Sequence, residues 1–87
     1  MGYYSTEQSM TAIGVYIGYE NGYFVFEFEN GDLVDFEEIN KIILVKYDLK
    51  SNMLKGKKFE ILYKEIINDL DDEDLIIFKL EELKLLP

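Results

Sequence analysis

The 87-residue chain contains no cysteine, no histidine and no arginine. The absence of cysteine excludes disulfides, a thiolate nucleophile and thiolate-ligated zinc or iron–sulfur sites. The absence of histidine removes the usual general base near neutral pH and the commonest ligand for transition metals. Without arginine, the chain also lacks the planar group that binds phosphate or carboxylate through two parallel hydrogen bonds. We therefore expect a protein that is not an enzyme and that holds no metal and no cofactor.

Long apolar runs are also missing. No stretch approaches the roughly 18 consecutive apolar residues that indicate a transmembrane helix, and the first residues lack the basic and apolar regions of a secretory signal. These absences predict a cytoplasmic protein with no membrane partner, although a chain from which a signal had been removed would look the same. The length fits a single domain.

Charge is distributed unevenly along the chain. The formal net charge is −9; residues 1–40 contain eight acidic residues and no lysine, whereas residues 41–87 contain ten acidic residues and all nine lysines. Such a protein should be repelled by nucleic acid and by anionic membranes. We therefore expect a protein partner, either one with a basic surface or a second copy of this chain, and we do not expect nucleic acid.

Residues 13–36 carry the strongest structural signal. Three alternating apolar runs are joined by Asn21-Gly22 and by Asn30-Gly31. Asn-Gly between such runs is typical of tight hairpin turns, because both residues tolerate positive φ. The sequence therefore predicts a three-stranded antiparallel meander, with strands at about residues 11–20, 23–29 and 32–37.

The alternation predicts the register of the first hairpin. A two-residue turn at Asn21-Gly22 places six apolar side chains on one face, in the pairs Tyr19–Phe24, Ile17–Phe26 and Val15–Phe28. The opposite face then holds the pairs Gly18–Val25, Tyr16–Glu27 and Gly14–Glu29. A shift by one residue would mix phenylalanine with glutamate on the same side, so the pattern favours this register.

The second turn should be one residue longer. A two-residue turn would place Asp35 opposite Phe26 on the buried face. A three-residue turn over 29–31, with Gly31 at positive φ in a G1 bulge, instead pairs Phe26 with Val34. We therefore predict the three-residue form.

The rest of the chain is less regular. Residues 1–10 show no periodicity and are expected to be a disordered arm or a cloning remnant, which leaves 11–87 as the folded domain. Residues 37–49 fit either a helix or a strand, and the strands expected on both sides favour a short helix.

Two strands should follow, at 57–66 and from residue 75 onward, separated by an acidic loop at 68–74. The tail after residue 80 could continue the last strand through a bulge or form one helical turn. The side chains expected to face the core from these two strands are those of Phe59, Ile61, Tyr63, Ile76, Phe78 and Leu80.

This order of elements, three strands, a short helix and two strands, resembles a five-stranded OB-type barrel. The segment Tyr47–Tyr63, YDLKSNMLKGKKFEILY, followed by an acidic loop and LIIFKLEELKLL, looks like the closing half of small OB-like bacterial proteins of unknown function. The resemblance covers most of 11–86 and implies a mainly β barrel in a bacterial protein. An SH3-like barrel also uses five short strands and is the alternative. Neither fold implies a function.

The outer face of the first hairpin is the candidate binding surface. Gly14 and Gly18 would leave room for another surface to approach, and Tyr16 and Tyr23 would stand beside them as amphipathic contacts. The remaining members of the set are Val25, Glu27 and Glu29. The alternative is that the two glycines only relieve strain where a barrel strand coils.

Two other charged clusters have simpler explanations. The acidic residues of 69–74 lack the spacing of an EF-hand calcium loop, because Asp74 stands where that loop needs glycine and Leu80 where it needs glutamate. A lysine cluster could contact an anionic ligand, but it also balances neighbouring acids and protects a strand edge. Its members are Lys50, Lys55, Lys57 and Lys58.

Together these features favour a non-catalytic protein-binding or adaptor domain with a strongly acidic sheet. The alternative is an OB-type module for a ligand or for single-stranded nucleic acid, which would combine aromatic side chains with a basic groove. The sheet supplies the aromatic side chains but has the wrong charge for nucleic acid.

Overall fold

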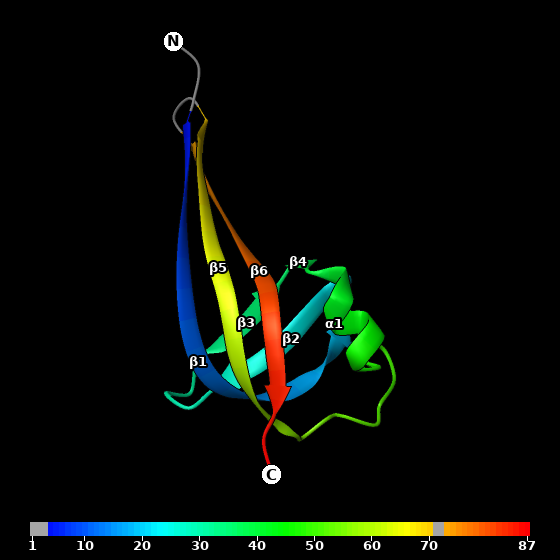
Figure 1. Ribbon diagram of the computed structural model, residues 1–87. Helices are drawn as coiled ribbons and strands as arrows, with labels where there is room; N and C mark the ends of the chain where they lie inside the picture. The colour runs from blue at the N-terminus through cyan, green and yellow to red at the C-terminus, as the bar shows by residue number, and fades with distance from the viewer. Residues whose placement is uncertain (1–3, 71–72) are drawn as a thin grey trace.

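A computed structural model describes residues 4–70 and 73–87 of the protein (Figure 1), with side chains for 7–67 and 76–87. The described chain is mainly β, with one short helix. One six-stranded sheet has the strand order β3-β2-β1-β5-β6-β4, in which only the β4–β6 pair is parallel. The elements are β1 Tyr4–Glu20, β2 Tyr23–Phe28, β3 Leu33–Phe36, β4 Glu38–Ile39, α1 Lys41–Lys46, β5 Lys58–Leu70 and β6 Glu73–Leu85.

The first hairpin follows the predicted register only beside its turn. Asn21 and Gly22 have φ of 53° and 87°, as the tight turn requires, and Gly18 lies opposite Val25. A β-bulge then leaves Ile17 without a partner. A bulge reverses the facing of every residue beyond it. The expected partners further along β1 are therefore wrong, and the observed pairs are Tyr16–Phe26, Val15–Glu27 and Gly14–Phe28.

The second turn has the predicted three-residue form. Gly31 has a φ of 93°, and its N–H donates to the carbonyl oxygen of Phe28 at 2.8 Å. The side chain of Asn30 accepts a hydrogen bond from the N–H of Asp32 at 2.9 Å, which stabilises the turn. The strands consequently pair Phe26 with Val34 and Phe24 with Phe36, as expected.

The strands β1, β5 and β6 are longer than predicted and extend beyond the rest of the molecule as a three-stranded arm (Figure 1). Residues 4–10 are not a disordered arm, because β1 pairs with β5 continuously from Tyr4 opposite Asp69 to Val15 opposite Lys58. The expected acidic loop is also mostly strand: residues 68–70 end β5 and residues 73–74 begin β6. Asp71 and Asp72 lie outside the described residues.

The tail continues β6 through a bulge, which is one of the two predicted forms. Leu62 pairs with Glu82 and Tyr63 with Leu80, so Glu81 is the extra residue. The bulge allows both Leu80 and Leu83 to be buried although they are three positions apart.

Core-facing residues on β5 and β6 follow the prediction with one exception. Phe59, Ile61, Tyr63 and Leu80 are buried, and Phe78 packs against them while partly exposed. Ile76 was expected to face the core but is 54% exposed, because it lies on the arm beyond the core.

The ambiguous segment after β3 forms the predicted short helix, α1. The side-chain oxygen of Asn40 accepts a hydrogen bond from the N–H of Ile42 at 3.2 Å and caps the helix. Lys46 lies in the last turn, where its charge is favourable toward the helix C-terminus. Ile43 is the buried residue of the helix and Leu44 packs against the core while partly exposed, so α1 covers one end of the core with these two side chains.

The core is a cluster of aromatic rings around Phe26. The ring of Phe26 lies 5.0 Å from that of Tyr16, 5.8 Å from that of Phe36 and 6.0 Å from that of Phe59, the last two edge to face. The other buried members are Phe24, Ile43, Leu49, Ile61, Tyr63, Leu80 and Leu83.

The two ends of the sheet are adjacent in sequence. Only Glu37 separates β3 from β4, although these strands stand at opposite ends of the strand order. The N–H of Glu37 donates to the carbonyl oxygen of Phe78 at 3.1 Å, and the N–H of Asn40 donates to Leu80 at 2.8 Å. Within the described chain, β3 itself forms a ladder with β2 only. The sheet therefore has six strands rather than the five predicted, and its two ends are not joined by a β3–β6 ladder.

Candidate functional site

Two of the predicted contact residues lie in the interior. Tyr16 was expected on the outer face, but its side chain is fully buried against Phe26. Gly14 is also buried, and a Cβ placed on it would stand 2.9 Å from the carbonyl oxygen of Glu27. Gly14 is therefore needed for the close approach of β1 to β2. The placement of Tyr16 and Gly14 on a binding surface is wrong, because the bulge at Ile17 turns them inward.

Tyr16 instead joins the sheet to the loop that follows α1. Its hydroxyl donates to the carbonyl oxygen of Leu49 at 2.5 Å. Its own backbone carbonyl accepts from the N–H of Gly56, and its N–H donates to the carbonyl of Lys57, at 2.8 and 2.9 Å. Burial raises the pKa of the Tyr16 phenol to about 12, and the neighbouring Tyr19 adds to the shift.

The predicted floor at Gly18 is occupied by the chain itself. A Cβ on Gly18 would stand 2.9 Å from Cε of Lys55, so the lysine side chain lies directly over the glycine. Gly18 has a φ of 155°, a conformation that other residues rarely adopt, and it adjoins the bulge. Glycine at position 18 therefore allows the unusual backbone conformation beside the bulge, and it also leaves the space that the Lys55 side chain occupies.

Three of the remaining predicted residues, Tyr23, Val25 and Glu27, lie on a continuous outer surface of β1, β2 and β3. Val25 lies between Gly18 and Asp35, and Glu27 lies between Val15 and Leu33 in the paired strands. Leu33 is 65% exposed and Tyr23 is 37% exposed. Glu29 is exposed in the second turn rather than opposite Gly14. We call this surface the acidic face; its members are Glu20, Tyr23, Val25, Glu27, Leu33 and Asp35.

The acidic side chains of this face form no ion pair among the described residues, although the side chains of Lys55 and Glu20 both lie over Gly18. The described ion pairs lie on β1, β5 and β6, where Lys64 approaches Glu7 at 3.3 Å and Lys79 approaches Glu81 at 3.5 Å. Among the described side chains, none of the acids of the acidic face has a lysine nitrogen within 4.0 Å. The negative charge of this surface is therefore open to a partner.

A groove runs along the outer edge of β3. It has a volume of about 410 Å³ and lies between the end of the second turn and β6. Its lining residues are Asp32, Leu33, Val34, Asp35 and Phe78. We call it the β3 edge groove. None of its residues was part of the predicted site, because the groove depends on how far β6 diverges from β3.

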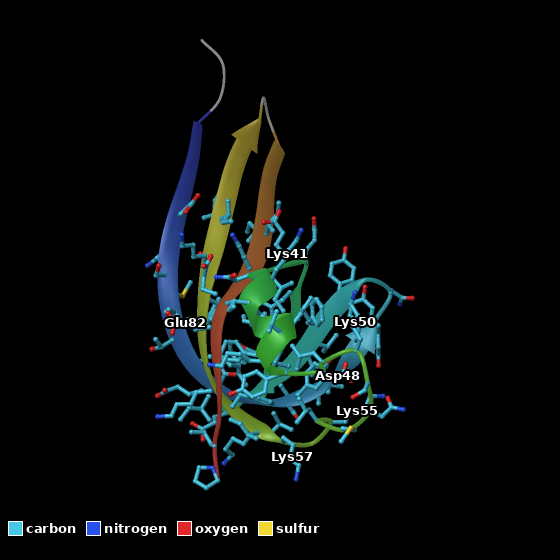
Figure 2. The ribbon with its side chains drawn as sticks, turned by 45° about the vertical axis from the view of Figure 1, so that its right-hand side comes forward. Lys41, Asp48, Lys50, Lys55, Lys57 and Glu82 are labelled. Atoms are coloured by element: carbon cyan, nitrogen blue, oxygen red, sulfur yellow. The ribbon has the colours of Figure 1, made fainter. Side chains whose placement is uncertain are left out.

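Residues 41–58 form a contrasting basic segment, comprising α1 and the loop that leads to β5. The segment holds six of the nine lysines and a single acidic residue, Asp48. Figure 2 shows Lys50, Lys55 and Lys57 along the loop. The ammonium group of Lys50 lies 5.1 Å from the ring centre of Tyr19.

The basic segment also exposes large apolar side chains. Ile42, Val45 and Met53 are 55%, 80% and 79% exposed. The lysine content was visible in the sequence, but the exposure of these side chains depends on the fold: Ile42 and Val45 lie on the side of α1 away from the buried Ile43, and Met53 lies in the loop.

The structure does not test calcium binding by the acidic stretch 69–74, for which the sequence favoured a solvated loop over a calcium site. The side chains of the acidic stretch 69–74 lie outside those described, and elsewhere in the described chain no three acidic side chains gather as metal ligands would. The described helix α1 has six residues and is too short to cross a bilayer.

Comparisons with protein-family models, with curated proteins and with solved structures returned no match to this chain. What the protein binds is therefore inferred from its own residues.

Proposed function

We propose that the protein is a non-catalytic binding domain for a protein partner with a basic surface, and that the acidic face is the contact surface. The observation that carries this proposal is the separation of charge. Residues 1–40, which include β1, β2 and β3, contain no lysine. The acids of the acidic face surround the exposed side chains of Tyr23 and Leu33, and a polar rim around such anchors is common at interfaces.

The position of Lys55 supports the same partner chemistry. This lysine of the chain itself lies across Gly18, beside the acidic face. A lysine side chain is thus already accommodated on this part of the sheet. A partner lysine or arginine would gain from the uncompensated acids nearby, and the attraction would be strongest at low ionic strength.

We also propose that the sheet is a variant of the OB-type barrel. In such barrels five strands close only partly. Counting β3 and β4 as one strand bent at Glu37 gives five strands, and the parallel β4–β6 pair brings the last part of that strand against the final one. An SH3-like barrel is the alternative. A cytoplasmic location in a bacterial cell belongs to this proposal and rests on the composition and the sequence pattern.

The binding proposal is tested by affinity capture on the immobilised protein from its source cells at increasing salt. The variant Glu27→Gln/Asp35→Asn removes two charges from the acidic face. The control Glu60→Gln/Glu82→Gln removes two charges from exposed positions on β5 and β6. We expect to capture a specific partner that elutes as the salt concentration rises. Its capture should be lost in Glu27→Gln/Asp35→Asn and retained in Glu60→Gln/Glu82→Gln. Capture that is insensitive to salt, or equally reduced in both variants, would contradict the proposal.

One observation favours the second candidate, a module for single-stranded nucleic acid or another anionic ligand. The basic segment places Lys50 against Tyr19, which combines a cation with a 39% exposed aromatic ring. Base stacking on aromatic side chains beside lysines is the usual mode of single-strand binding. Titration with a fluorescent single-stranded oligonucleotide at low salt tests it. Binding that is lost in Lys50→Gln/Lys55→Gln would establish this candidate in place of the first.

A further inference from the structure

The outer edge of β3 presents unpaired backbone groups. At one end of β3, the carbonyl oxygen of Asp32 points toward β2 and accepts a hydrogen bond from the N–H of Phe28. At the other end, the N–H of Glu37 points away from β2 and donates to the carbonyl oxygen of Phe78 on β6. Backbone groups alternate in direction along a strand. The N–H and C=O of Leu33 and Asp35 therefore point away from β2, into the β3 edge groove. Among the described residues, no backbone group pairs with them there.

The edge of β6 that faces the groove is occupied by β4 near Phe78 and Leu80 and is unpaired beyond Phe78, among the described residues. The carbonyls of Phe78 and Leu80 accept hydrogen bonds from Glu37 and Asn40. Beyond Phe78 toward the arm, β6 pairs with β5 only, within the described ladders. The chain therefore already adds one short strand, β4, to this edge, and the pairing stops where the groove begins.

The side chains along the groove have a two-sided pattern. Val34 and Phe78 pack against the core and form its apolar side. Asp35 and Leu33 alternate with Val34 and are exposed on the opposite side, with Asp32 at the end. A strand laid along β3 would place alternate side chains beside these two surfaces. One set would meet Val34 and Phe78, and the other would meet carboxylates.

We propose that the β3 edge groove binds an extended segment of a partner protein, which pairs with β3 as an added strand and alternates aliphatic with basic residues. Strand addition to an open edge is an established mode of peptide recognition, in which backbone hydrogen bonds give affinity and alternate side chains give specificity. This inference rests on the proposed function and specifies its partner.

A second copy of this chain fits the groove less well. Two β3 edges that paired with each other would bring Asp32 and Asp35 of both copies together. Like charges placed across paired strands are destabilising. Lysine, which commonly protects exposed strand edges, is absent from β1, β2 and β3. Charge repulsion therefore disfavours pairing of this edge with a second copy, whereas a strand with basic side chains would be attracted to it.

The test uses a labelled, end-capped hexapeptide of alternating lysine and valine, with binding followed by fluorescence anisotropy at low salt. A second peptide carries N-methyl groups on alternate residues, which removes backbone donors and keeps the charge. A third replaces lysine with glutamate. We expect the first peptide to bind and the glutamate peptide to show no binding. The methylated peptide should bind more weakly than the first by roughly tenfold or more.

Two variants of one residue separate the backbone from the side chain. Leu33→Pro removes the N–H that points into the groove and leaves the β2–β3 ladder intact, since proline is tolerated at an edge. Leu33→Ala keeps that N–H and removes the side chain. Urea denaturation verifies that both variants fold. We expect Leu33→Pro to weaken peptide binding roughly tenfold, with a smaller effect of Leu33→Ala.

Amide hydrogen exchange gives a direct readout on the wild-type protein. Bound peptide should slow exchange at Leu33 and Asp35, because their N–H groups acquire acceptors. If the methylated peptide binds as tightly as the parent, or if these two amides exchange unchanged, strand addition is overturned while a basic partner for the acidic face remains. If the lysine peptide fails to bind and the charge variants also leave partner capture unchanged, the proposed function is overturned as well.

Discussion

The hydroxyl of Tyr16 donates a hydrogen bond to the carbonyl oxygen of Leu49, 33 positions later in the chain, and both residues are buried. This bond connects β1 with the loop after α1, and it explains how that loop is held against the sheet although few of its side chains are buried. Tyr16 is therefore a structural residue, and its removal should affect stability rather than binding.

Tyr16→Phe should destabilise the fold by about 1–3 kcal/mol, because the buried carbonyl of Leu49 loses its partner. Tyr47→Phe is the matched control. The hydroxyl of Tyr47 accepts from the N–H of Leu85 in an exposed bond at 3.1 Å, so its loss should cost less. Urea denaturation measures both. Equal losses in the two variants would mean that the Tyr16 bond adds nothing specific to the fold.

Stability should fall at alkaline pH. The pKa of Tyr16 is raised to about 12 in the folded protein, mainly by burial, and that of Tyr63 is raised for the same reason. The folded state then binds protons more tightly than the unfolded state, so this contribution is complete below pH about 10 and is lost between pH about 10 and 12. For Tyr16, two pH units correspond to at most about 3 kcal/mol. Denaturation at pH 8 and pH 11 should show a smaller loss in Tyr16→Phe than in the wild type.

Phe26→Ala should destabilise the protein by about 3–5 kcal/mol, because Phe26 is fully buried at the centre of the aromatic cluster. Its neighbour Glu27 is exposed on the acidic face, and Glu27→Ala should change stability by only about 0.5 kcal/mol. Thermal or urea unfolding of the pair checks the facing of β2. Similar losses in both would show that the strand is placed the wrong way round.

Gly31→Ala should cost about 1 kcal/mol through backbone strain alone, because Gly31 has a φ of 93° and a Cβ there would meet no atom within 4 Å. Gly31→Asn should be better tolerated, since asparagine enters this region more readily. The comparison uses urea unfolding. A neutral Gly31→Ala would argue against the three-residue turn.

The local features of the fold could be predicted from the sequence, because short-range chemistry determines them. Each Asn-Gly pair specifies its own turn, and the difference between the two turns follows from keeping Asp35 away from Phe26. Only the two turns were decided by residues within a few positions of one another. The short helix after β3 was predicted from the strands expected on both sides of it, and the tail of β6 was left open between a bulged strand and one helical turn.

The binding surface could be predicted only in part, because one bulge decides the facing of β1. Gly18, Tyr23, Val25 and Glu27 lie on the expected side, whereas Tyr16 lies on the other. Nothing in the local alternation distinguishes Tyr16 from Ile17 as the inward residue. The choice depends on Leu49, which provides the acceptor for the Tyr16 hydroxyl, and on the space between β1 and β2.

The arm was missed for a similar reason. Residues 4–10 have no alternation of their own, and they become a strand by pairing with β5. Clustered acids at 68–74 argued for a loop, yet residues on both sides of 71–72 continue the ladder between β5 and β6. Pairing between distant segments outweighed local composition.

The order of the strands in the sheet has a consequence for synthesis of the chain. β1 leaves the ribosome before β5, but its long ladder is formed with β5, which follows after α1 and its loop. Until then, the meander of β1, β2 and β3 has its phenylalanine face uncovered. Ladders between such distant segments favour slow folding. The nascent first half therefore remains exposed to association with other chains until the second half emerges.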